Sequence, residues 1–202
     1  MSTRPVPERL ATQLASGASG FAVTFDDVRM EDVAVASGIP RATLYYYFAG
    51  KEELLAFVLR TMLDDLEASV AIAQGRARDA RGRLAAVVRA QLAHLAANPG
   101  ASRLLLLNLG RAGRIGAIAA GIDAAFHAPV RQILIQGIEA GDLVALDVEV
   151  ATTAVYGSVV AVGLQALLSR GGIDVDATAE RLIALLWSGI AAPGPEARRA
   201  RP

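Results

Sequence analysis

Residues 41–51 gather the side chains of this 202-residue chain that are best suited to hydrogen-bond a polyanion: Arg41, Thr43, the run Tyr45–Tyr47, and Lys51. Hydroxyl groups and an ammonium suit phosphate oxygens, and a guanidinium can hold two acceptors of a guanine at once. Neighbouring positions on a helix point about 100° apart, so three consecutive rings cannot share one buried face. At least one tyrosine ring must therefore face outward.

The residue types of enzymes and metal sites are scarce. The chain has no cysteine and only two histidines, His94 and His127, which excludes thiolate catalysis and the usual cysteine-based zinc sites. No phosphate loop of Walker type, no His-Glu metal spacing and no catalytic triad stands out. The sequence therefore predicts a protein that is not an enzyme and has no metal or cofactor.

Apolar spacing and helix breakers predict an all-α chain of about nine helices. Beyond the weakly periodic residues 1–24, which hold Gly17 and Gly20, the expected helices span 30–37, 41–48, 51–74, 80–97, 101–110, 114–139, 147–170 and 176–191. Gly38 is placed to end the first of these as a left-handed residue, and Pro129 to kink the sixth after His127. The pairs Gly141-Asp142 and Gly171-Gly172 are expected breaks.

Helices 30–37 and 41–48, joined by a turn with glycine, predict a helix-turn-helix. In that motif the second helix enters the major groove of DNA, and its N-terminal residues face base edges. Here those residues are Arg41, Ala42 and Thr43, while Leu44 and Phe48, spaced i and i+4, form the inward face. The alternative is that the tyrosines belong to a core and an aromatic helix edge.

The segment "MEDVAVASGIPRATLYYYFAGKEELLAFVL" resembles the DNA-binding segment of the TetR family of transcriptional regulators. The pattern is a helix, a glycine, Ile or Val, then Thr-Leu-Tyr with aromatic neighbours and Lys-Glu-x-Leu, and the match covers Phe25 to about Val58. A looser stretch, "QILIQGIEAGDLVALDVEVATTAVYGSV", is similar to the family's effector and dimer region. Arg29 stands where a Ser or Thr cap is frequent, so Asp26 or Asp27 is expected to cap the helix, or its start to shift.

The resemblance implies a role for each outward residue of the motif. Arg41 and Ala42 would face bases, Thr43 would donate to a phosphate, and Tyr45 would meet a base methyl or the backbone. Tyr46 and Tyr47 would lie along the sugar-phosphate chain, and Lys51 would clamp a phosphate. Residues 1–60 carry six basic and seven acidic side chains, so such contacts must depend on placement and not on bulk charge.

The resemblance also divides the chain into a DNA-binding domain at 1–50, a helical effector-binding and dimerisation domain at 51–192, and a disordered tail at 193–202. The last two helices would pair two subunits, through the apolar positions Val155, Val159, Val162, Leu182, Leu186 and Trp187. Polar groups in apolar surroundings are candidates for the effector pocket: Asn108, Arg111, His127, Tyr156 and Gln165. Both sets could instead be ordinary core or surface residues.

The expected protein is thus a ligand-responsive regulator, in the first instance a repressor, that binds a near-palindromic double-stranded DNA operator as a homodimer. Its effector is expected to be a small apolar or amphipathic molecule. The polar N-terminus indicates a cytoplasmic location, although residues 150–169 form an uncharged run of 20 residues that could also span a membrane. The main rival is a helical protein that binds a small molecule or a partner without binding DNA.

Overall fold

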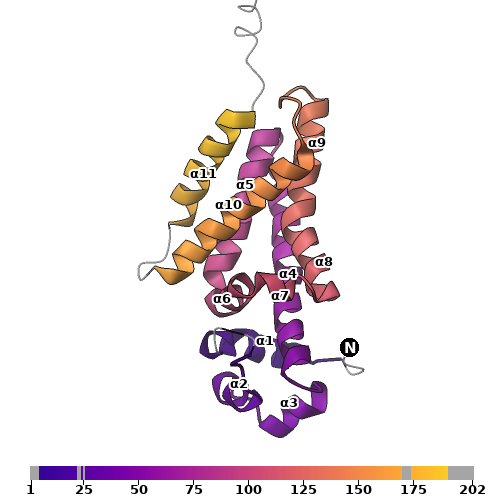
Figure 1. Cartoon of the computed structure of the whole chain (residues 1–202), viewed down its shortest axis with the longest axis vertical. Coiled ribbons are helices and arrows are strands. Elements are labelled where there is room, and N and C mark those ends of the chain that lie inside the picture. The colour runs from indigo at the N-terminus through magenta and orange to yellow at the C-terminus, as the bar shows by residue number, and fades with distance from the viewer. Residues whose placement is uncertain (1–4, 22–23, 25, 170–173, 191–202) are drawn as a thin grey trace, which may run out of the picture.

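The computed structural model describes residues 5–21, 24, 26–169 and 174–190, and the regular elements within these ranges are all helices. Figure 1 shows a small group of short helices at one end of an elongated bundle. We call α1 to α3 the head and α5 to α11 the body; α4 joins the two. The predicted tail at 193–202, the Gly171-Gly172 break and Phe25 lie outside the described residues.

The head consists of α1 (Glu8–Gly17), the 3-10 turn η1 (Ala18–Gly20), α2 (Met30–Ser37) and α3 (Arg41–Tyr47). Helix α1 buries Leu10 and Leu14, which are spaced i and i+4. Its final residue, Gly17, lies against the end of α2, where an added Cβ would come within 2.7 Å of the Cα of Ser37. A glycine that looks unfavourable for a helix is therefore what allows α1 to approach α2 closely.

The turn between α2 and α3 has the geometry that the sequence predicts. Gly38 adopts φ 67°, a left-handed conformation that a residue with a side chain rarely adopts. Leu44 and Phe48 are buried, with exposed fractions of 0% and 1%. Helix α2 begins after Arg29 without a side-chain cap, so neither aspartate caps it as expected.

The body is reached through α4 (Lys51–Gln74), which begins beside α3 and runs up into the bundle (Figure 1). Its apolar positions are buried at helical spacing from Leu54 to Val70. The body helices are α5 (Ala80–Ala97), α6 (Pro99–Leu107), α7 (Leu109–Ala112), α8 (Gly116–Ile122), η2 (Asp123–His127), α9 (Ala128–Glu139), α10 (Val148–Leu168) and α11 (Val175–Ile190).

The helix expected at 114–139 is divided into α8 and α9 by η2, a π-helical turn. Pro129 has no N–H to donate to the carbonyl of Ala125, four residues earlier, and its ring crowds that carbonyl. The Nε2 of Gln91 on α5 donates to this oxygen at 3.0 Å, and Gln91 is only 1% exposed. The expected break at Pro129 is thus replaced by a π-helical turn within a helical segment that continues to Glu139. A buried glutamine donates to the carbonyl that the proline cannot serve.

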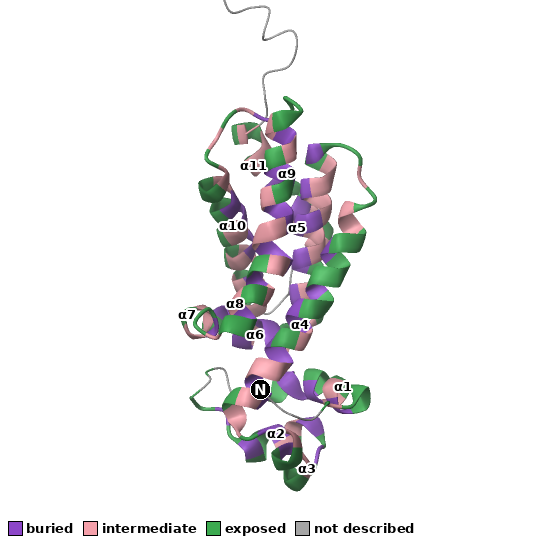
Figure 2. Ribbon diagram, turned by 90° about the vertical axis from the view of Figure 1, so that its right-hand side faces the viewer, coloured by how far each residue is buried: buried purple, intermediate pink, exposed green. Residues whose placement is uncertain are grey.

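Helices α10 and α11 both pack on α5 and lie along one flank of the body (Figure 1). Asp147 caps α10, because its carboxylate accepts hydrogen bonds from the backbone N–H groups of Glu149 and Val150. Exposed positions recur along α10 in Figure 2, and they include the apolar side chains of Val150 and Leu168. Leu185 on α11 is also exposed.

Candidate nucleic-acid interface

The outer face of α3 carries several exposed side chains. Arg41 and Ala42 are exposed, and the rings of Tyr45 and Tyr46 are 47% and 57% exposed. Tyr47 is half-buried against the core, with its ring edge-on to Tyr46 at 5.0 Å. Helix α3 lies at the end of the molecule remote from the body, where Figure 2 shows exposed surface. Two of the three tyrosine rings therefore face outward, where their spacing requires at least one.

Arg41 is held by two neighbours. Its Nη1 lies 2.7 Å from Oε1 of Glu31 on α2, and its guanidinium carbon lies 5.3 Å from the centroid of the Tyr45 ring. Hydrogen bonding to Tyr45 and the charge of Glu31 raise the pKa of Arg41. The side chain is fully charged and has a defined direction before any ligand arrives.

Lys51 lies at the first position of α4, beside the end of α3, and its Nζ donates to the backbone carbonyl of Asp26 at 2.7 Å. The single lysine of the chain thus joins the head loop at Asp26 to the start of α4. Glu53 Oε2 accepts from the N–H of Ala49 at 2.7 Å and so steadies the short link between α3 and α4.

Arg111, which the sequence suggested for the effector pocket, faces the head. Its Nη1 donates to Oδ1 of Asp26, and its Nη2 donates to Oε1 of Glu52 at 2.7 Å. The hydrogen bond and the charge of Arg111 lower the pKa of Asp26. We call Arg111, Asp26 and Glu52 the ionic bridge, because these residues join α7 of the body to the head loop and to the start of α4.

The family model for "Bacterial regulatory proteins, tetR family" matches residues 22–58. This range contains α2, the glycine turn, α3 and the first part of α4. These residues carry the DNA-binding segment of the TetR family. TetR proteins are DNA-binding transcriptional regulators and not enzymes, and this chain is a regulator of that general kind.

Solved structures show the TetR fold over nearly the whole chain. The fatty acid degradation regulator FadR from Bacillus halodurans is 19% identical, with a TM-score of 0.78 over 91% of this chain and 96% of that one. The ketosteroid regulator KstR2 of Mycobacterium tuberculosis is 22% identical, with a TM-score of 0.76 over 94% and 98%. FadR from Bacillus subtilis, solved with stearoyl-CoA, is 18% identical, with a TM-score of 0.74 over 90% and 97%. A sequence search of curated proteins finds no match.

The other residues suggested for the effector pocket do not form one group. Asn108 Nδ2 donates to the carbonyl of Leu104 at 2.7 Å, and Gln165 is exposed on α10. His127 and Tyr156 do lie together, with ring centroids 4.4 Å apart and the rings nearly perpendicular. Burial raises the pKa of Tyr156. The structure thus brings two of the five residues into contact, both near the π-helical turn.

Thr152 is a polar residue of this region that the sequence reasoning missed. It lies one helical turn before Tyr156 on α10 and is 2% exposed. Within the described part of the chain, its Oγ1 and the Nε2 of His127 are buried without a hydrogen-bond partner. Buried polar atoms normally have partners, so these two atoms are available to a ligand. A threonine within the apolar run 150–169 was the only signal in the sequence.

The residues suggested for the dimer interface divide into two groups. Val155, Val159 and Leu182 are buried inside the chain itself. Val162, Leu186 and Trp187 are half-buried. Among the described residues, one helix, α10, is long and apolar enough to cross a membrane. Only 22% of its most apolar stretch is buried inside the chain. Much of its apolar surface is therefore uncovered in the single chain.

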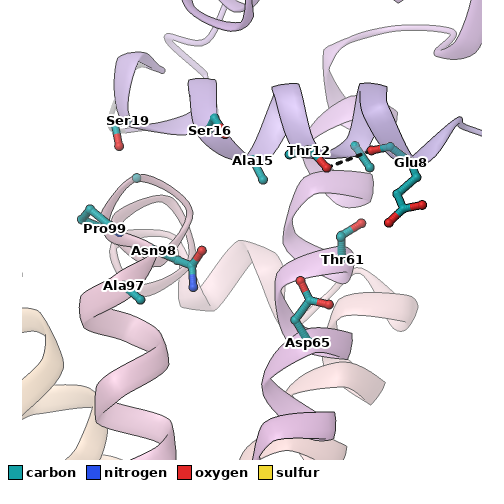
Figure 3. A pocket seen from close by; sticks show the side chains of 12 residues that line it. Glu8, Thr12, Ala15, Ser16, Ser19, Thr61, Asp65, Ala97, Asn98 and Pro99 are labelled. Carbon is teal, nitrogen blue, oxygen red and sulfur yellow. Dashed lines mark hydrogen bonds between the residues drawn. The ribbon is translucent and has the colours of Figure 1, made fainter.

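A cleft of about 450 Å³ separates the head from the body. Figure 3 shows α1 on one side of it, with α4 and the junction of α5 and α6 on the other. Thr12, Thr61, Asp65 and Asn98 are among its lining residues. The cleft ends at Gly100, where an added Cβ would lie 2.3 Å from the backbone nitrogen of Ser19. Head and body therefore touch through bare backbone at this point.

Proposed function

We propose that this TetR-family protein is a cytoplasmic, ligand-responsive repressor that binds a near-palindromic operator as a homodimer. The observation that carries the proposal is the outer face of α3, where Arg41, Tyr45 and Tyr46 are exposed on a helix anchored by buried Leu44 and Phe48. A helix held this firmly from behind presents its outer side chains in fixed directions. That is the requirement for reading base edges in a major groove.

The proposed contacts follow the geometry of this face. Arg41 and Ala42, at the N-terminus of α3, would meet base edges, and Thr43 would donate to a phosphate. Tyr45 and Tyr46 would reach the groove wall and the sugar-phosphate backbone. Tyr47 is half-buried, so its hydroxyl group, not its ring, would make the contact. Lys51 would exchange the carbonyl of Asp26 for a phosphate oxygen.

The proposed dimer forms through α10 and α11. Val150, Leu168 and Leu185 are 65%, 66% and 72% exposed, and an apolar face of this kind is typical of a surface that a partner covers. A second copy of the chain is the partner that an inverted-repeat operator requires, since one α3 then reads each half-site. Val162, Leu186 and Trp187, which are half-buried, lie where they can contribute to the rim of this interface.

The proposed effector is an apolar or amphipathic molecule that binds in the body beside Tyr156. The unpaired Oγ1 of Thr152 and Nε2 of His127 are the polar groups that would orient it. The relatives with this fold include a regulator solved with stearoyl-CoA and a ketosteroid regulator. Long-chain acyl thioesters and steroids are therefore the first compounds to screen.

The division of the chain remains part of this proposal. We place the DNA-binding domain at 1–50 and the effector and dimer domain at 51–192. Helix α4 follows α3 closely in the chain, with Phe57 of α4 against Phe48 at 5.4 Å, and runs into the body (Figure 1). A shift of α4 caused by an effector would therefore change the position of α3. In a dimer, such a shift would alter the separation of the two recognition helices.

Selection of random duplex DNA by the purified dimer tests the proposal. An enriched inverted repeat is the expected result, and a scrambled duplex should bind with a strongly salt-dependent, lower affinity. A screen for compounds that release the enriched duplex then identifies the effector. A folded, dimeric protein that enriches no sequence would indicate the rival function, a helical protein that binds a ligand or a partner without DNA.

A further inference from the structure

Glu31 lies on α2, outside the recognition helix, yet its carboxylate contacts the first residue of that helix. Its Oε1 is 2.7 Å from Nη1 of Arg41, and the two side chains are 51% and 57% exposed. We infer that Glu31 is a positioning residue that aims Arg41 at one base pair of the operator and keeps it from acting as a general phosphate contact. This inference rests on the proposed function.

The geometry restricts where the guanidinium can go. A guanidinium is planar and carries five N–H donors in a fixed fork. Glu31 takes a donor at Nη1, and the ring of Tyr45 lies 5.3 Å from the guanidinium carbon. Five donors are more than Glu31 and Tyr45 occupy, and a pair of guanidinium N–H groups matches the O6 and N7 acceptors of a guanine. A phosphate contact through the Nη1 donor requires Arg41 to leave Glu31.

An exposed ion pair of this kind adds little to the stability of a fold. The ion pair matters instead for DNA binding, because Arg41 is the first residue of the helix that would enter the groove. A carboxylate at that place is repelled by DNA unless Arg41 stays beside it. Glu31 therefore disfavours any binding mode in which Arg41 turns away from it to contact a phosphate. Binding through phosphates alone does not depend on the DNA sequence.

Two measurements separate this role from simple charge repulsion. In the full-length dimer, Glu31→Gln should tighten binding to scrambled DNA and steepen its salt dependence by about one in the log–log slope, since one more cation becomes free to meet a phosphate. The preference for the base pair contacted by Arg41 should fall by about tenfold. Asp32→Asn is the matched control, because Asp32 is the next residue, is exposed, and loses the same charge.

The control decides between the two explanations. If Asp32→Asn leaves the base preference unchanged while Glu31→Gln weakens it, Glu31 acts through its contact with Arg41. Equal changes in both variants, or an unaltered base preference in Glu31→Gln, would overturn the inference.

A double-mutant cycle gives an independent test. In an Arg41→Ala background, Glu31→Gln should have no further effect on base preference, because the residue through which it acts is gone. A full effect of Glu31→Gln in that background would contradict the inference. A wild-type protein that enriches no sequence at all would overturn the proposed function, and this inference with it, whereas an enriched motif insensitive to Glu31→Gln would overturn the inference alone.

Discussion

The backbone of Gly100, at the start of α6, lies directly against the backbone of Ser19, in η1 of the head. A Cβ on residue 100 would be 2.3 Å from the nitrogen of Ser19 and 2.4 Å from the carbonyl carbon of Ala18. Neither neighbour is a flexible side chain, so neither can move aside without moving the head. This contact and the ionic bridge both join the body to the head.

Gly100→Ala is expected to separate this contact. The added methyl must displace η1, and overpacking of this kind costs about 1–3 kcal/mol. The measurement is the urea midpoint of unfolding, with intrinsic tryptophan fluorescence and circular dichroism as probes. Gly116→Ala is the matched control, because a Cβ on residue 116 meets nothing within 4 Å. A Gly100→Ala protein as stable as the control would show that the head is not tightly seated at this point.

The ionic bridge should make the seating of the head depend on salt. Arg111→Ala removes both contacts, to Asp26 and to Glu52, so protease cleavage within the head should be faster than in the wild type at low salt. The difference should shrink in high salt, where the wild-type bridge is screened. Arg114→Ala provides the comparison, since this exposed neighbour has no ion pair among the described residues. Equal cleavage rates in the two variants would argue against the bridge.

Gln91→Leu should destabilise the body although it buries an additional apolar side chain. The carbonyl of Ala125 loses its donor because Pro129 supplies no backbone N–H. A buried acceptor left without a partner costs about 1–3 kcal/mol. Chemical denaturation measures the change, and Gln132→Leu, at an exposed position of α9, should shift the midpoint little. A neutral Gln91→Leu would mean that another group reaches this carbonyl.

His94 should make the fold less stable in mild acid. Burial lowers its pKa below the ordinary value of 6.5, although the charge of Asp65 and the backbone of Met62 act in the opposite direction. Because the pKa is lower in the folded state, the unfolded state binds more protons below pH 6.5. Stability should therefore fall as the pH drops through 6.5 and continue to fall until the folded-state pKa is passed.

Urea midpoints at pH 5.5, 6.5 and 8 measure this effect. The drop on acidification should be smaller in His94→Gln than in the wild type, and His127→Gln should retain it. If acidification reduces the stability of all three proteins equally, the burial of His94 is not its cause.

Helix α3 was predictable because its signals are local. Leu44 and Phe48 are one helical turn apart, and Gly38 is needed for a left-handed residue, so sequence neighbours alone define the inward face and the turn. The π-helical turn before Pro129 was not predictable, since the proline indicates a break but not its geometry. Helix α1 was not clearly predicted, because Gly17 disfavours a helix. The reason for this glycine is its close contact with Ser37 at the end of α2, which the local sequence does not reveal.

The body was less predictable for a physical reason. Helix α10 is apolar on all sides, so its sequence does not indicate which residues face the core. Val155 and Val159 proved to be buried in the chain itself, whereas Val150 and Leu168 are exposed. Arg111 was predicted as a pocket residue from its apolar sequence neighbours, and it lines a pocket of about 380 Å³ with Glu52, Arg114 and Ile115. Its partners, Asp26 and Glu52, come from segments that only the tertiary fold brings near.

DNA reading by the outer face of α3 is tested by a parallel selection of random duplex DNA with the wild-type dimer and with Arg41→Ala. The wild type should enrich an inverted repeat with a preferred guanine in each half-site. Arg41→Ala should retain the repeat and lose that preference, by about 1–3 kcal/mol in direct binding. No repeat from a folded wild-type dimer, or the same motif from both proteins, would contradict the claim that the outer face of α3 reads DNA.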